Sequence, residues 1–180
     1  RQVIAARPAQ ADAHNILGVT LAAAKRTDAA VESLKRAIKL NPQAPSYHSN
    51  LGEVLRQAGR RDEALGALTE ALRLDPNNAQ TLNNLGIIHF DQGKFKQAVD
   101  FYRKAIAARP NMAEAHNNLG NALRQTGDID VALSAYQDAL VHRAVYPEAY
   151  NNLGSLLQQD RKFDEAEHAY RKAIQQNGKY

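Results

Sequence analysis

The side chains of this 180-residue chain best suited to chemistry are asparagines that recur every 34 residues: Asn50, Asn84, Asn118 and Asn152. A primary amide offers a donor and an acceptor, so it can pair with the N–H and C=O of an extended peptide without reading its side chains. Asparagine costs up to about 0.7 kcal/mol relative to alanine in a helix, so its recurrence needs a reason. We expect a track for a peptide backbone; bonding between repeats or plain solvation is the alternative.

The 34-residue interval extends over the whole chain. Leu-Gly pairs end at Gly18, Gly52, Gly86, Gly120 and Gly154, and alanines follow each glycine after 12 and 19 residues. With the glycine as position 8, the repeats are residues 11–44, 45–78, 79–112, 113–146 and 147–180. Residues 1–10 are then the tail of a preceding repeat helix, which Pro8 is expected to end.

Each repeat is predicted to form two amphipathic helices. Apolar residues fall at positions 3, 7, 10, 11 and 14 of the first segment and at 17, 20, 21, 24, 27 and 28 of the second, which is helical spacing. Gly59, Gly93 and Gly127 separate the two segments, where a left-handed cap is favoured. The small residues at positions 8, 20 and 27 indicate that the two helices pack closely.

This pattern of Leu-Gly, alanine, an aromatic residue four positions later and proline resembles the tetratricopeptide repeat. The resemblance implies an all-α fold, a right-handed superhelical solenoid of helix-turn-helix repeats whose first helices line a concave groove. One departure is Ala144, where proline is expected, with Pro147 three residues later. This departure leaves the angle between the fourth and fifth repeats open.

Two segments, His116-Asn117-Asn118-Leu119-Gly120 and Tyr150-Asn151-Asn152-Leu153-Gly154, look like the repeats of O-linked N-acetylglucosamine transferases and their bacterial relatives. In that family an asparagine ladder at position 6 holds substrate or partner peptides. Carried over, the ladder falls on the four asparagines above, and Ile16 interrupts it. The resemblance leaves two functions open: a protein–protein interaction module, or the substrate-recognition arm of an O-GlcNAc-transferase-like glycosyltransferase whose catalytic domain is absent from this chain.

Other residues at inward repeat positions complete the expected peptide-binding groove. They are Asn121 at position 9 and Arg56, Phe90 and Arg124 at position 12. The two arginines could bind acidic side chains or a carboxylate; solvated surface charges are the alternative.

No residue pattern indicates catalysis or metal binding. Cysteine is absent, and there is no glycine-rich phosphate loop or nucleophile elbow. His14, His48 and His116 share position 4, where they are expected to pack between helices, because equivalent positions about 10 Å apart cannot share a zinc ion. His89 is expected to be partly buried and hydrogen-bonded, with tuning of the groove as the alternative. We expect no enzyme activity, no metal and no cofactor.

The charge distribution argues against a nucleic-acid partner. The net charge is +4, yet positions 1–14 of the repeats contain six acids and two bases, so the positive excess lies outside the first helices. The apolar runs are too short to span a membrane and no leader is visible, so we expect no membrane role and a cytoplasmic protein.

The ends of the chain suggest a segment of a longer array. The chain begins with Arg1, and no polar capping helix follows the fifth repeat. Terminal repeats need such caps, so Ile4, Tyr170 and Ile174 are expected to be partly uncovered. Weak self-association through these uncapped ends is a further expectation.

Overall fold

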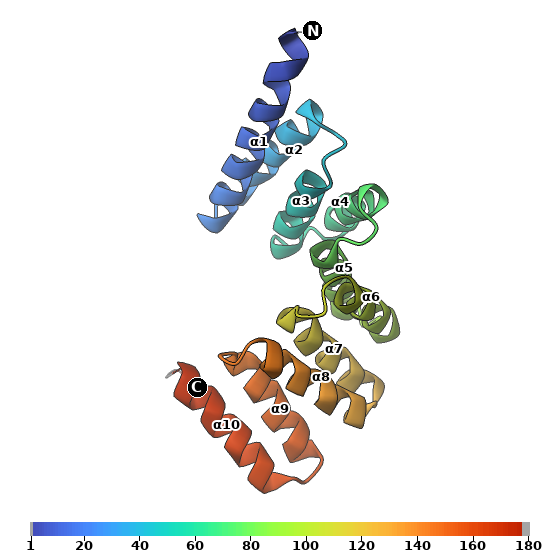
Figure 1. The fold of residues 1–180 in the computed structure, drawn as a ribbon, viewed down its shortest axis with the longest axis vertical. Coiled ribbons are helices and arrows are strands. Elements are labelled where there is room, and N and C mark those ends of the chain that lie inside the picture. Colours follow the sequence, from blue (N-terminus) through green and yellow to red (C-terminus); the bar gives the residue numbers. More distant parts are fainter. Residues whose placement is uncertain (1, 178–180) are drawn as a thin grey trace. The chain divides into compact units, whose positions relative to one another are not determined.

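The computed structural model describes the backbone of residues 2–177 and the side chains of residues 9–176. The described backbone forms ten α-helices and no strand (Figure 1). The helices are α1 (Gln2–Ala23), α2 (Thr27–Leu40), α3 (Pro45–Gln57), α4 (Arg61–Leu74), α5 (Ala79–Asp91), α6 (Phe95–Ala108), α7 (Ala113–Thr126), α8 (Ile129–His142), α9 (Pro147–Gln159) and α10 (Phe163–Asn177). The predicted all-α repeat fold is therefore confirmed.

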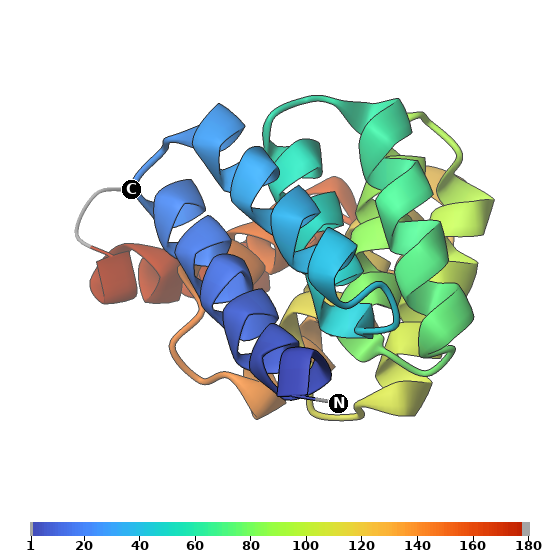
Figure 2. The same cartoon turned by 90° about the horizontal axis from the view of Figure 1, so that it is seen from above.

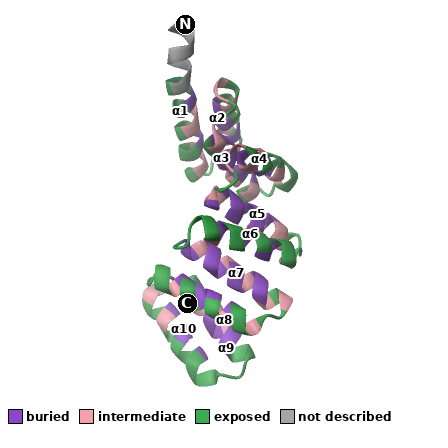
Figure 3. Ribbon diagram, turned by 45° about the vertical axis from the view of Figure 1, so that its right-hand side comes forward, coloured by how far each residue is buried: buried purple, intermediate pink, exposed green. Residues whose placement is uncertain are grey.

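The helices form two compact units, unit 1 (residues 1–88) and unit 2 (residues 89–180). In unit 1, α1 packs on α2 and α3 packs on α4, and α1 and α2 lie side by side in Figure 2. In unit 2, α7 packs on α8 and α9 on α10, with further contacts of α6 with α7 and α8 with α9. Figure 3 shows buried residues on α7 and α9, whereas α6 and α10 present mostly exposed residues.

One helix differs from the sequence-based expectation. α1 is continuous from Gln2 to Ala23, so it crosses the expected boundary between residues 10 and 11 and does not end at Pro8. After α2 and α4 a side-chain amide or carboxylate turn accompanies the end of the helix: the Gln43 N–H donates to Asn41 Oδ1 and the Asn77 N–H donates to Asp75 Oδ1, both at 3.3 Å. The segment Arg7-Pro8-Ala9-Gln10 carries no Asn or Asp that could form such a turn.

Small residues let the two helices of a pair approach closely. A Cβ atom added to Gly120 on α7 would lie 2.6 Å from Cε1 of Tyr136 on α8, whose side chain is fully buried. A Cβ atom on Gly52 would lie 2.5 Å from Cγ of Leu68. The alanines at positions 20 and 27 of the described repeats are buried as well. The predicted close packing at these positions is confirmed.

The turn between the helices of a pair needs a left-handed residue. Gly59, Gly93 and Gly127 have φ values of +73°, +71° and +89°, which confirms the predicted cap. The same position holds Lys25 with φ +59° and Arg161 with φ +60° in the first and fifth repeats.

The junction at Ala144 is held by a side chain from α10. Gln176 Nε2 donates to the Ala144 carbonyl at 2.8 Å, and the Tyr146 N–H donates to Gln176 Oε1 at 3.0 Å. α9 then begins at Pro147, the same repeat position at which α3 begins. The missing proline therefore does not shift the register of the helices.

Two of the position-4 histidines pack between helices as predicted. His48 Nε2 lies 2.8 Å from the Pro42 carbonyl oxygen, and His116 Nε2 lies 2.8 Å from that of Pro110. Both side chains are buried. Because a carbonyl can only accept, Nε2 carries the proton in each case.

His89 is half-buried, and its ring stacks on Phe101 with a centroid distance of 5.0 Å. Its Nδ1 is buried without a hydrogen-bond partner in the described structure, so the predicted hydrogen bond is not made at that atom. Burial, reinforced by the positive charge of Lys94, lowers the pKa of His89.

Replacing glycine by alanine should have opposite effects at two helical positions. Gly120→Ala is expected to lower the free energy of unfolding by about 1–3 kcal/mol, because the buried Tyr136 ring has no room to move. Gly66→Ala on α4, where a Cβ would meet nothing within 4 Å, is expected to raise it by about 0.5–1 kcal/mol. Urea denaturation followed by circular dichroism measures both; a stabilising Gly120→Ala would contradict the close-packing interpretation.

Acid should destabilise the fold through His89. Its pKa is lower in the folded than in the unfolded chain, so stability is lost as the pH falls below the ordinary histidine value of about 6.5. The variant His89→Leu removes this loss. Its stability relative to the unsubstituted chain should therefore rise between pH 7.5 and pH 5.5 in urea denaturation. A difference that does not change with pH would contradict the prediction.

Candidate peptide-binding face

The first helices of neighbouring repeats carry the predicted site residues on one side. Position 9 follows position 6 by three residues, and positions 12 and 13 follow position 9 by three and four, which puts all four on one side of a helix. α1 contacts α3 in unit 1, and α7 contacts α9 in unit 2. We call the surface formed by these positions the first-helix face of each unit.

The first-helix face of unit 1 contains a hollow of about 250 Å³. It is lined by Val19, Ala22 and Ala23 of α1 and by Asn50, Glu53, Val54 and Gln57 of α3. The α1 side is apolar and the α3 side is mainly polar. The hollow therefore combines a small apolar wall with groups that can hydrogen-bond.

Two ladder asparagines bind the preceding repeat with one donor each. Asn50 Nδ2 donates to Asn15 Oδ1 at 2.8 Å, and Asn152 Nδ2 donates to Asn117 Oδ1 at 3.0 Å. No hydrogen bond to the Oδ1 atom of Asn50 or Asn152 is found within the described residues. Each of these amides thus joins two repeats and keeps an acceptor and a second N–H.

The other two ladder asparagines are in different environments. Asn84 on α5 is only 1% exposed, Gln80 Nε2 donates to its Oδ1 at 3.4 Å, and its Nδ2 has no partner in the described structure. Asn118 on α7 is half-buried. The four asparagines therefore share a repeat position but differ in how far their side chains are exposed.

Arg56 is neutralised inside its own helix. Its Nε and Nη2 donate to Glu53 Oε2 at 3.0 Å and Glu53 Oε1 at 2.8 Å, and Gln57 Nε2 donates to the same carboxylate at 2.6 Å. This bidentate pair leaves the first-helix face of unit 1 without a free positive charge at position 12.

Arg124 has the same repeat position in unit 2 but different neighbours. Its Nη1 donates to Ser155 Oγ at 3.2 Å, and the Tyr136 hydroxyl donates to Asn121 Oδ1 at 2.7 Å. Burial raises the pKa of Tyr136 to about 12, although the nearby Arg124 charge opposes this shift. The phenol therefore stays a donor at neutral pH and holds Asn121 beside the arginine.

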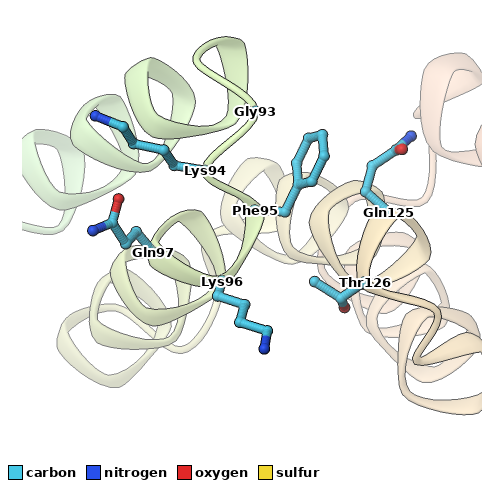
Figure 4. Close-up of a pocket in the computed structure, with 7 residues that line it drawn as sticks. All are labelled: Gly93, Lys94, Phe95, Lys96, Gln97, Gln125 and Thr126. Atoms are coloured by element: carbon cyan, nitrogen blue, oxygen red, sulfur yellow. The ribbon is translucent and has the colours of Figure 1, made fainter.

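Phe90 lies next to a second hollow, which the sequence did not indicate. Its ring contacts Phe95 edge-on at 5.3 Å. The hollow of about 580 Å³ is lined by Gly93, Lys94, Phe95, Lys96, Gln97, Gln125 and Thr126. In Figure 4 the Phe95 ring points toward Gln125, whereas the Lys94 side chain extends away. Gln125 lines this hollow and is at position 13, so the hollow lies beside the first-helix face of unit 2.

The contacts around Tyr136 and Ser155 are not indicated by the sequence pattern. The sequence predicts only an apolar core residue at position 24, yet the Tyr136 hydroxyl reaches Asn121 at position 9. In the fifth repeat position 9 is Ser155, and the Tyr170 hydroxyl instead donates to Gln158 Oε1 at 2.9 Å. An asparagine at position 9 together with a tyrosine at position 24 of the same repeat is the sequence pattern that could have predicted this hydrogen bond.

The outer side of the last repeat is partly uncovered, as predicted. Ile174 is 48% exposed and Tyr170 is half-buried. Both line a hollow of about 370 Å³, together with the exposed Phe163. Ile4, for which the same was expected, lies outside the residues whose side chains are described. Self-association through these ends stays a prediction.

The described residues contain neither a metal-binding cluster nor a helix suited to a membrane. Within the described residues, no group of three or more His, Asp or Glu side chains could hold a metal ion. None of the helices between residues 2 and 177 combines the length and apolar character needed to cross a membrane.

Comparison with known proteins gives the family. Three tetratricopeptide repeat models match residues 20–59, 43–111 and 117–180. No curated protein matches the chain. The narrower resemblance to O-GlcNAc transferase repeats stays a prediction.

Several solved structures share the fold. The pilF protein of Pseudomonas aeruginosa is 23% identical, with a TM-score of 0.89 over 97% of this chain and 80% of that one. TTC0263 of Thermus thermophilus is 27% identical, with a TM-score of 0.78 over 94% and 92%. YrrB, a repeat protein with an unusual peptide-binding site, is 21% identical, with a TM-score of 0.71 over 93% and 86%. The chain therefore belongs to the tetratricopeptide repeat family, and its repeats are those of a protein–protein interaction module.

Proposed function

We propose that this chain binds an extended protein segment on its first-helix face, mainly through the backbone of that segment. The observation that carries the proposal is that the Asn50 amide uses only one of its N–H groups within the described part of the protein. One N–H is fixed by Asn15 at 2.8 Å, and the same residue lines the hollow between α1 and α3. The amide is thus held in place while its acceptor and second donor are left for a ligand.

The spacing of the repeats supports a backbone-reading mode. First helices that pack at about 10 Å would present one amide for roughly three residues of a strand that advances about 3.3 Å per residue. Asn152, held by Asn117, repeats the arrangement in unit 2. A ligand bound through such amides is selected for its extended conformation more than for its side chains, which suits an adaptor with several partners.

The residues of this face support binding of a ligand without a catalysed reaction. The polar groups of the first-helix face among the described residues are amides, hydroxyls and charged side chains, which hold a ligand but provide no activated nucleophile. The peptide-binding site of the structurally similar YrrB is in keeping with this class of ligand. An amide track also fits the substrate-recognition arm of a glycosyltransferase, but no contact in the described residues favours that alternative.

The proposal predicts different effects for the two partners of one hydrogen bond. Asn50→Ala and Asn15→Ala both remove the bond between them, so both should lower the free energy of unfolding by about 0.5–1.5 kcal/mol. Only Asn50→Ala should weaken peptide binding, by about fivefold for a lost bond of roughly 1 kcal/mol. The probes are labelled twelve-residue peptides selected from a random phage-displayed library, with affinity measured by fluorescence anisotropy.

The second pair of asparagines repeats the test in unit 2. Asn152→Ala should weaken the binding of peptides that occupy this unit, and Asn117→Ala is the matched control, since both lose the same bond. Equal affinities for the two members of both pairs would show that these amides serve only to join the repeats. The amide-track proposal would then be wrong.

A further inference from the structure

The two arginines at position 12 differ in whether their charge is already satisfied. Arg56 forms a bidentate ion pair with Glu53, with an Nη2–Oε1 distance of 2.8 Å. Arg124 forms no ion pair with any described residue, and its hydrogen bond is to the neutral Ser155 hydroxyl at 3.2 Å. The same repeat position thus holds a neutralised cation in unit 1 and a cation with its charge unpaired in unit 2.

The residue at position 9 accounts for the difference. Glu53 lies one helical turn before Arg56, and its carboxylate pairs with the guanidinium. Asn121 lies one turn before Arg124 and carries no charge. The Asn121 oxygen is moreover occupied by the Tyr136 hydroxyl at 2.7 Å. Asn121 is therefore held by its acceptor end, and the Nδ2 group is the part left to donate.

The acids on α7 and α9 are associated with other cations. Glu114 pairs with Arg143 at 2.8 Å, and Glu148 also acts on the charge of Arg143. Asp160, just after α9, pairs with Lys162 at 2.8 Å. None of these carboxylates forms an ion pair with Arg124.

We propose that Arg124, with Asn121 and Ser155, binds the side-chain carboxylate of an aspartate or glutamate in the extended segment held by unit 2. This inference rests on the proposed peptide-binding function and adds a selective position to it. A guanidinium binds a carboxylate through two parallel hydrogen bonds. The Asn121 amide and the Ser155 hydroxyl add neutral donors beside it, and the half-buried position of Arg124 strengthens the contact.

A side-chain carboxylate fits this place better than the end of a peptide. The face carries ladder amides on both α7 and α9, at Asn118 and Asn152. Arg124 reaches across to Ser155 on α9, and the Asn152 amide on the same helix uses one N–H for Asn117, so a segment that continues past Arg124 can also pair with this amide. The ligand is therefore an acidic residue inside a continuous extended segment.

The test compares the peptides selected by four proteins. Random twelve-residue peptides are displayed at the amino end of a phage coat protein, so that no free peptide carboxyl terminus is present. The unsubstituted chain should enrich aspartate or glutamate at one position. Arg124→Gln should lose that enrichment, and so should Asn121→Glu, which copies the arrangement of Glu53 and Arg56. Arg103→Gln on α6 changes the charge equally at an exposed site and should keep it.

Synthetic peptides give the measurement that does not depend on a protein variant. A selected peptide with an amidated carboxyl terminus is compared with the same peptide in which the acid is replaced by glutamine or asparagine. The loss of affinity for the unsubstituted chain should be about tenfold, as expected for a charge-assisted hydrogen-bonded pair. Arg124→Gln should bind both peptides with the same low affinity.

Four results would overturn the inference. They are a selected pool without a preferred acid, equal binding of the acidic and amide peptides, the same acid preference in Arg124→Gln, and binding that needs a free terminal carboxylate. Each of these leaves the peptide-binding function standing. If the unsubstituted chain captures no peptide at all, the proposed function fails and this inference fails with it.

Discussion

The close approach of two helices within each repeat is the constraint on which the rest of the structure depends. At Gly120 and Gly52 the partner side chains Tyr136 and Leu68 occupy the space where a Cβ would stand. The large side chain of the second helix therefore packs directly against the backbone of the first helix. The first helix is then fixed against the second, and its remaining side is free to meet the neighbouring repeat and a ligand.

The same packing brings a core residue into the candidate site. Tyr136 is fully buried, yet its hydroxyl passes beside Gly120 to reach Asn121 Oδ1 at 2.7 Å. A phenol combines an apolar body with a polar tip, so it can fill a core and still orient a surface group. The contact that orients Asn121 therefore depends on the space that Gly120 leaves for the Tyr136 ring.

The ladder asparagines contribute to the stability of the array and, in the proposed function, also to recognition. An asparagine that only faced water would destabilise its helix and contribute nothing to the stack. Asn50 and Asn152 offset that cost by donating one hydrogen bond each to the preceding repeat. Because an amide has two donors and an acceptor that takes two bonds, the structural bond does not exhaust it. A residue type that is unfavourable for the helix can thus serve both the array and its ligand.

The sequence by itself determined the repeat, the two helices of each repeat and the left-handed turn at Gly59, Gly93 and Gly127, because these features depend on short-range periodicity and on backbone conformations that few residues adopt. It also placed the polar stripe on the first helices. The tertiary structure alone shows that Asn84 is buried while Asn50 lines a hollow, that the Arg124 guanidinium meets Ser155 of the next repeat, and that α1 continues past residue 10. These outcomes depend on which atoms meet across helices, and repeat positions of equal sequence pattern meet different neighbours.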